Sequence, residues 1–390
     1  MGLYNFNPDY IIPIRKGRNT MKQRTLLSMA FIGSLFLIMA FVTSAGASSK
    51  YQDQQLQHGK YIASIAGCPV CHTPYKAEYQ NPATLTLEQI QTLAFNESNA
   101  LDQNKLLAGG RVFQLGPIGN LLTRNLTPDK ETGIGSWTTD QIKVAVTTGL
   151  AIDGKMLFPV MPYHTYNGMA DADLEDVIIY LQSVNAVTNK IPERTISTEG
   201  MQPLPYKSGI VAPDASDKAA RGDYLVNHVL SCTDCHTPVD PTTGAPIMDK
   251  YLAGGQPYEG PWGIVYGGNI TPDKTTGIGS WTDNEVKRAL LTGVRKDGRR
   301  LILMPWFVYS NLTAEDADAV VYYLKNGLPA VNNEVPATSL NKGFEQMAHA
   351  EPNQTTAANG VMSPIILVVV GIGVILLVSL VVYLMRRKSA

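Results

Sequence analysis

Apolar residues recur at helical spacing in two stretches that end in the same five-residue pattern. These stretches are HGKYIASIAGCPVCH at residues 58–72 and ARGDYLVNHVLSCTDCH at residues 220–236. Apolar positions three and four residues apart form one face of a helix. Both stretches therefore predict a helix that leads into a Cys-x-x-Cys-His motif.

Each half of the chain shows two further helical patterns. Thr138 with Gln141, and Thr282 with Glu285, have the spacing of a capping box and predict the start of a middle helix. The last helices are expected at LEDVIIYL, residues 174–181, and ADAVVYYL, residues 317–324, with Asp171 and Thr313 as candidate caps. The connecting loops are rich in Gly and Pro and carry little strand signal, so we expect an all-α fold.

A long apolar segment, LLSMAFIGSLFLIMAFV, lies near the N-terminus at residues 26–42. Basic residues precede it and small residues follow it, which is the layout of a secretory signal. We therefore predict a signal peptide over residues 1–47, with Met21 as an alternative start to Met1. A retained N-terminal membrane span is the alternative.

A second apolar segment, IILVVVGIGVILLVSLVVYLM, lies near the C-terminus at residues 365–385. As a helix it would be about 30 Å long, which matches the hydrocarbon core of a bilayer. Arg386, Arg387 and Lys388 follow it directly, and the positive-inside rule places such residues in the cytoplasm. We predict one transmembrane helix over 364–385, preceded by a polar tether over 331–363.

The charge is distributed unevenly, although the formal net charge is only −1. Both ends of the chain are basic, and acidic side chains outnumber basic ones between them. An acidic body argues against nucleic acid as a partner and favours a basic partner surface.

The middle of the chain is a duplicated module. NLTPDKETGIGSWT from Asn125 recurs as NITPDKTTGIGSWT from Asn269, and LAGG at Leu107 recurs at Leu252. The repeat predicts module one over residues 51–187, a Pro-containing linker over 188–215 and module two over 216–330. Module one carries an insertion, here called the insertion segment, within residues 76–105, where we expect a short helix.

The four cysteines all lie in the two Cys-x-x-Cys-His copies. A zinc site, a thioredoxin-like redox motif and two short disulfides are the alternatives. Thioether attachment of haem fits best, because one helical turn aligns both sulfurs with one porphyrin edge and delivers the following histidine to the iron. We predict two covalently bound haem c groups, held by Cys68, Cys71 and His72 in module one and by Cys232, Cys235 and His236 in module two.

The sixth iron ligand is expected from a methionine. Module one offers Met156, Met161, Met169 and His164, but the repeat matches only Met161 to a methionine, Met304. The predicted axial ligands of the iron are therefore His72 with Met161 and His236 with Met304. Two protein ligands close both coordination positions, which suits electron transfer and leaves no expected catalytic residue.

The motifs CxxCHT, LAGG, N[LI]TPD, GIGSWT and Met-Pro, followed by a helix ending in Tyr-Leu, resemble those of class I c-type cytochromes. More narrowly, they resemble the cytochrome subunits of membrane-bound alcohol, gluconate and related dehydrogenases over about residues 56–186 and 217–328. The resemblance implies two tandem cytochrome c domains with the ligand roles given above. Those subunits commonly carry three haem motifs, whereas this chain carries two.

We therefore expect a dihaem cytochrome c anchored in the cell (inner) membrane by a single pass, with its haem domains on the periplasmic side. Its expected role is that of the electron-accepting subunit of a periplasmic dehydrogenase, without catalysis of its own. One alternative is a tethered respiratory carrier between a quinol-oxidising complex and a terminal oxidase or reductase. A dihaem peroxidase is the other.

Overall fold

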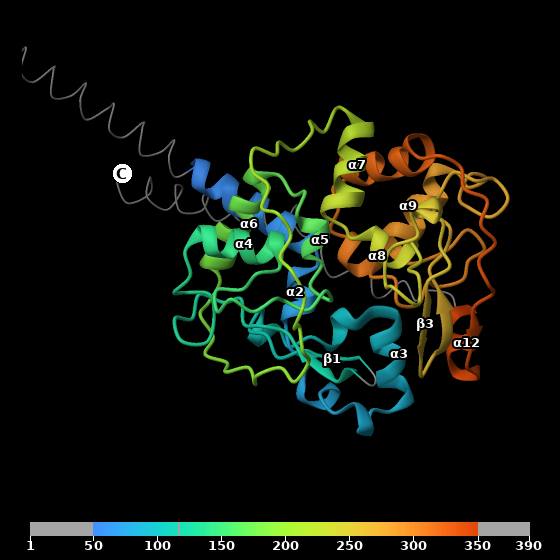
Figure 1. The fold of residues 1–390 in the computed structure, drawn as a ribbon. Coiled ribbons are helices and arrows are strands. Elements are labelled where there is room, and N and C mark those ends of the chain that lie inside the picture. Colours follow the sequence, from blue (N-terminus) through green and yellow to red (C-terminus); the bar gives the residue numbers. More distant parts are fainter. Residues whose placement is uncertain (1–49, 116–117, 350–390) are drawn as a thin grey trace, which may run out of the picture.

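The computed structural model describes residues 50–115 and 118–349 (Figure 1). Residues 50–65 form a first helix, which precedes the labelled ones. The further α-helices are α2 (Cys68–His72), α3 (Leu87–Asn96), α4 (Thr139–Thr148), α5 (Tyr163–Tyr166), α6 (Asp171–Ser183), α7 (Lys218–His228), α8 (Cys232–His236), α9 (Asp283–Thr292), α10 (Trp306–Tyr309), α11 (Ala314–Tyr322) and α12 (Lys342–His349). A π-helical turn, Tyr323–Gly327, continues α11.

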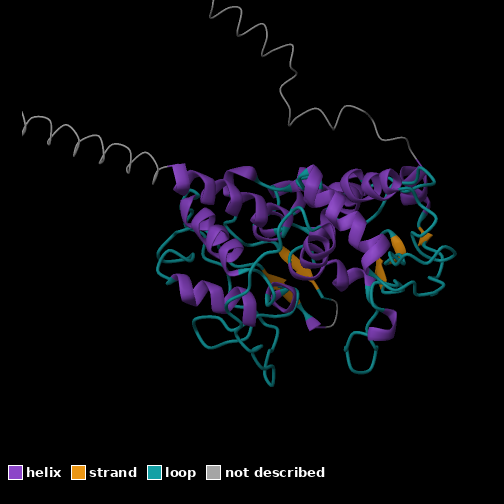
Figure 2. Ribbon diagram, turned by 90° about the horizontal axis from the view of Figure 1, so that it is seen from above, coloured by secondary structure: helices purple, strands orange, loops and turns teal. Residues whose placement is uncertain are grey.

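Short strands make two antiparallel sheets, so the predicted all-α class is wrong. Strands β1 (Val112–Gln114) and β2 (Asn120–Leu122) form a hairpin in module one. The second sheet has the order β3 (Pro257–Gly260), β4 (Gly263–Tyr266) and β5 (Ser339–Leu340). Strands of this length are too short for a two-residue alternation of apolar and polar positions to stand out in the sequence. Figure 2 shows that helices nevertheless dominate the molecule.

The membrane helix that completed the predicted fold class does not occur in the described structure. Within residues 50–115 and 118–349, no helix is both long and apolar enough to cross a bilayer. The predicted span at 364–385 and the predicted signal at 1–47 lie outside the described residues.

Helix starts follow the predicted capping chemistry with one exception. Thr138 and Thr282 form complete capping boxes at α4 and α9, and Thr313 caps α11. Asp171 is instead the first residue of α6, where its carboxylate accepts a hydrogen bond from the Gly209 amide at 2.8 Å. The linker over 188–215 forms no helix or strand, in agreement with its proline content.

In each module, the first helix packs closely against the last. A Cβ atom on Gly59 would overlap the Asp176 carbonyl of α6, and a Cβ atom on Gly222 of α7 would overlap the Ala319 carbonyl of α11. Glycine lets the two backbones touch at each crossing. The two crossings are equivalent positions of the repeat.

The two modules meet through a reciprocal pair of hydrogen bonds. The Tyr61 hydroxyl of module one donates to Asp316 of module two at 2.5 Å. The Tyr224 hydroxyl of module two donates to Asp173 of module one at 2.6 Å. Because the tyrosines and the aspartates are equivalent in the repeat, the modules pair with approximate twofold symmetry, as two subunits of a symmetric dimer do.

One apolar core runs through both modules. Its members include Ile62 and Ile178 of module one and Leu225 and Val320 of module two. A smaller second cluster joins the insertion segment to the end of the described chain, and Figure 1 shows α3 on the side of β3 and α12. The domain boundaries themselves stay a prediction, because the continuous core does not mark them.

Candidate haem sites

Each Cys-x-x-Cys-His motif forms its own one-turn helix, α2 or α8, rather than the end of the preceding helix. The chain turns sharply just before it, at Gly67 (φ 81°) and at Ser231 (φ 52°), both in the left-handed region. This turn directs the motif away from the axis of the first helix. All four cysteines carry free thiols, so each pair is available for thioether chemistry.

The two motif histidines are held in one tautomer by backbone carbonyl groups. His72 Nδ1 lies 2.8 Å from the Arg124 carbonyl oxygen, and His236 Nδ1 lies 2.6 Å from the Gly268 carbonyl oxygen. A carbonyl only accepts hydrogen bonds, so Nδ1 must carry the proton and donate it. Nε2 then keeps its lone pair, which is the form that binds a metal ion.

Burial sets the protonation of the motif side chains. It lowers the pKa of His72 to about 4, against the opposing effect of the Arg124 carbonyl, and it also lowers the pKa of His236. Burial raises the pKa of Cys68 and of Cys232 to about 12. At neutral pH the imidazoles are therefore neutral and the thiols protonated.

The predicted methionine ligands occupy equivalent places. Met161 and Met304 are half-buried, pack against the main core and precede the prolines that begin α5 and α10. The rival sulfurs differ, because Met156 and Met169 are 5% and 4% exposed and fill the interior of module one. Ligation by Met161 and Met304 stays a prediction.

The remaining rival ligand, His164, makes a different contact. It is exposed, and its Nε2 lies 2.8 Å from Asp234 in the second motif. This pair joins α5 of module one to α8 of module two. It is therefore a contact between the modules at the edge of both candidate sites.

Two sets of hydrogen bonds occur in the same form in both modules and stabilise the loops next to the motifs. Thr73 and Thr237 accept hydrogen bonds from the amides of Leu107 and Leu252, each at 3.0 Å. The side chain of Asn125 accepts from the Thr127 amide, as its counterpart Asn269 does from Thr271. Both asparagines thereby fix the turn that follows them, and Trp137 and Trp281 pack against the main core.

Arg111 was missed by sequence reasoning although it directly follows LAGG. Its guanidinium donates to the Val70 carbonyl of α2 at 2.9 Å and to Glu97 at 2.6 Å, and it lies 4.4 Å from the centre of the Phe113 ring. Its Nε is buried without a partner among the described residues. A buried cation beside the first motif suits the anionic side groups of a porphyrin.

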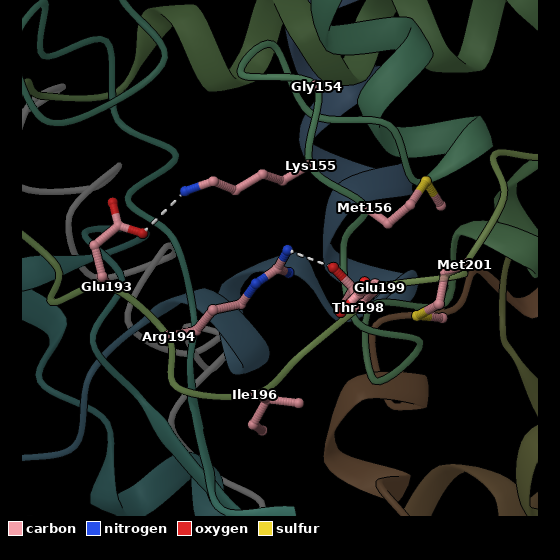
Figure 3. Close-up of a pocket in the computed structure, with 9 residues that line it drawn as sticks. All are labelled: Gly154, Lys155, Met156, Glu193, Arg194, Ile196, Thr198, Glu199 and Met201. Carbon is pink, nitrogen blue, oxygen red and sulfur yellow. Dashed lines mark hydrogen bonds and ion pairs between the residues drawn. The ribbon is translucent and has the colours of Figure 1, made fainter.

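The residues present fit a haem at each motif. Each site combines two free thiols on one helical turn and a neutral imidazole with a free Nε2, and each module adds a methionine that packs against the main apolar core. These are the donors of a thioether-linked haem with histidine and methionine ligands. A separate polar cavity of about 350 Å³ lies between module one and the linker, and none of the predicted ligands lines it (Figure 3).

The sequence comparisons point to the same class of protein. No family model matches the chain. Its homologues are cytochrome c subunits of dehydrogenases, together with a dihaem cytochrome c. The identities are modest but extend over most of the chain.

Three relatives illustrate the range of identity and coverage. The chain is 30% identical over 291 residues to the cytochrome subunit of fructose dehydrogenase from Gluconobacter japonicus, covering 70% of this chain and 52% of the relative. It is 26% identical over 319 residues to the gluconate 2-dehydrogenase cytochrome c subunit from Pantoea cypripedii, covering 75% and 64%. It is 28% identical over 241 residues to a dihaem c-type cytochrome from Cereibacter sphaeroides, covering 58% and 77%. The chain thus spans about half to two thirds of the two dehydrogenase subunits.

Proposed function

We propose that this protein is a dihaem cytochrome c that transfers electrons outside the cytoplasm as the electron-accepting subunit of a dehydrogenase. The observation that carries the proposal is the duplicated imidazole geometry. In both modules a backbone carbonyl fixes the Nδ1 proton and leaves Nε2 free, directly after two free thiols.

The residues of the chain would divide the work as follows. Cys68 and Cys71 would hold one haem and Cys232 and Cys235 the other, while His72 and His236 supply the imidazole ligands. A haem bound in this way supplies one-electron chemistry, and a methionine ligand raises its reduction potential. The carbonyls of Arg124 and Gly268 keep both imidazoles oriented, which limits rearrangement when the charge of the site changes.

The proposed partner rests on the relatives. Two of them are named as cytochrome subunits of fructose and gluconate dehydrogenases, and the acidic body of this chain would suit a basic docking surface. A respiratory carrier between a quinol-oxidising complex and a terminal oxidase or reductase is the alternative, since one relative is named only as a dihaem c-type cytochrome and not as a dehydrogenase subunit.

We further propose that both haem modules lie on the extracytoplasmic side of the cell membrane. The support is the signal-like sequence of residues 21–47. Protease treatment of intact spheroplasts provides the test. Degradation of the modules is the expected result, and full protection until the cells are lysed would contradict the location.

Haem counting tests the cofactor assignment. The denatured, acetone-extracted chain should keep two haems, measured as the alkaline pyridine complex against protein mass. Cys71→Ala together with Cys68→Ala should keep one, and the matching change of Cys232 and Cys235 should keep the other. A colourless protein, or complete loss of haem on acid-acetone extraction, would contradict covalent attachment.

Purification in mild detergent tests the partner. Co-isolation of a flavin- or quinone-dependent dehydrogenase, whose substrate reduces the cytochrome, is expected. Co-isolation with an oxidase or reductase would favour the carrier instead. Peroxide turnover by the unaltered protein that survives Met161→Ala would indicate the peroxidase.

A further inference from the structure

The end of α3, in the insertion segment of module one, contacts the loop of module two that carries Met304. The Leu303 amide donates a hydrogen bond to the Ala94 carbonyl at 2.8 Å. The indole Nε1 of Trp306 donates to the Phe95 carbonyl, also at 2.8 Å. Two cross-module hydrogen bonds therefore flank Met304 in the chain, one on each side.

The first of these bonds holds a strained residue. Leu303 has φ 66°, in the left-handed region that side chains other than glycine rarely adopt. Such a conformation persists only where its surroundings impose it. Because Leu303 directly precedes Met304, its conformation sets the direction in which the methionine leaves the backbone.

A buried apolar cluster packs behind the Ala94 and Phe95 carbonyl groups. Phe95 is 2% exposed and stacks on Phe344 of α12, with 6.5 Å between ring centres and an interplanar angle of 15°. The Arg300 guanidinium lies 4.7 Å from the centre of the Phe95 ring, and buried Ile302 completes the contact. The cluster packs α3 against residues 300–303, the segment that directly precedes Met304.

Module one holds its own methionine loop differently. Tyr163 occupies the place of Trp306, and both rings lie over the glycine that ends the middle helix, Gly149 or Gly293. A tyrosine has no indole N–H. In module one the Met161 amide donates a hydrogen bond to the Phe158 carbonyl of the same loop at 3.0 Å.

We propose that Phe95 and Trp306 are positioning residues for Met304, so that module one controls the sixth ligand of the iron in module two. The inference rests on the proposed function, because it takes Met304 as an iron ligand. It also assigns a role to the insertion segment, namely the positioning of Met304. The segment breaks the symmetry of two otherwise similar modules, because it holds the loop of Met304 through hydrogen bonds from another module, whereas the loop of Met161 is held within module one.

The same few residues reach the other site as well. Glu97, two positions after Phe95, pairs with Arg111 at 2.6 Å, and Arg111 bonds to the carbonyl of Val70 in α2. The stretch 94–97 thus contacts the motif helix of module one and the ligand loop of module two. It is one of two described contacts that link the two candidate sites, the other being the His164–Asp234 pair.

Two mild variants test the proposal in the haem-loaded protein. Trp306→Phe removes the indole donor but keeps an aromatic ring over Gly293, and Phe95→Leu removes the stack on Phe344. Gln91→Ala is the matched control, because Gln91 donates from α3 to the Gly343 carbonyl at 3.0 Å without touching the ligand loop.

The readouts are the red charge-transfer band of methionine-ligated ferric haem and carbon monoxide binding to the ferrous protein. Loss of one hydrogen bond should raise the population of the methionine-dissociated state about fivefold. We expect carbon monoxide to bind one haem per chain more readily in both variants, with the second haem unchanged. Gln91→Ala should behave as the wild type.

Met304→Ala distinguishes failure of the positioning role from failure of the assignment of Met304 as a ligand. If it opens a carbon monoxide site while Trp306→Phe and Phe95→Leu leave both haems unchanged, the positioning role is refuted and the haem assignment stands. If Met304→Ala opens no site, Met304 is no ligand and that part of the proposed function fails. Equal changes at both haems, or an equal effect of Gln91→Ala, would indicate general loosening of the module contact and would also refute the positioning role.

Discussion

Replacement of Asp316 by alanine should strongly destabilise module two and weaken its contact with module one. The Asp316 carboxylate is 4% exposed and accepts two hydrogen bonds from Arg221, at 2.8 Å each, as well as one from Tyr61 of the other module. Burial alone would raise the pKa of Asp316, but the bonds from Arg221 and Tyr61 hold it below the usual value. The carboxylate is therefore ionised and fully partnered at neutral pH.

The magnitude follows from what the substitution leaves behind. Arg221 is 8% exposed, so Asp316→Ala leaves a buried guanidinium without its counter-ion. Removing one member of a buried ion pair costs about 3–5 kcal/mol. Replacing both, as in Arg221→Met with Asp316→Leu, should recover most of this loss, because an apolar pair of similar volume needs no desolvation.

The repeat supplies a matched control. Asp173 occupies the equivalent position and accepts a hydrogen bond from Tyr224, but the place of the arginine is taken by the His58 imidazole, at 3.6 Å, whose side chain is 40% exposed. Water can solvate that histidine when the aspartate is removed, so Asp173→Ala should cost only about 1–3 kcal/mol.

Urea unfolding of the haem-loaded protein, followed by circular dichroism, measures both values. The reasoning fails if Asp316→Ala lowers the free energy of unfolding by less than about 1 kcal/mol. It also fails if Asp173→Ala proves as costly as Asp316→Ala.

Three further predictions concern local contacts. Gly222→Ala should lower the free energy of unfolding in urea by about 1–3 kcal/mol, because the new methyl group would overlap the Ala319 carbonyl. An unchanged urea midpoint would contradict the close helix crossing. Thr282→Ala should lower stability by about 1 kcal/mol through loss of the cap of α9, while Thr282→Ser should retain most of it. The hydrogen bond to Asp234 raises the pKa of His164 above 6.5, so its stabilising effect is complete below that pH and is lost as the pH rises through the folded-state pKa. His164→Gln should therefore lower the melting temperature slightly at about pH 5.5 and leave it unchanged at about pH 8.5, a small effect because both groups are exposed.

The sequence alone determined the local features of this protein. The Cys-x-x-Cys-His motifs, the capping boxes at Thr138 and Thr282 and the turns at Asn125 and Asn269 depend on residues close together in the chain. Their chemistry is set by side-chain type and spacing, so it could be predicted without a fold. The duplication could be predicted for the same reason, because equivalent residues recur in the same order.

Tertiary structure decided which distant groups meet. The carbonyl partners of His72 and His236, the reciprocal bonds of Tyr61 and Tyr224 and the buried ion pair of Asp316 join residues far apart in the chain. The three-residue and four-residue strands likewise form because a partner segment is held alongside, and the all-α expectation failed for that reason. Side-chain patterns specify which face of an element is apolar, whereas the packing of whole modules determines which other element covers it.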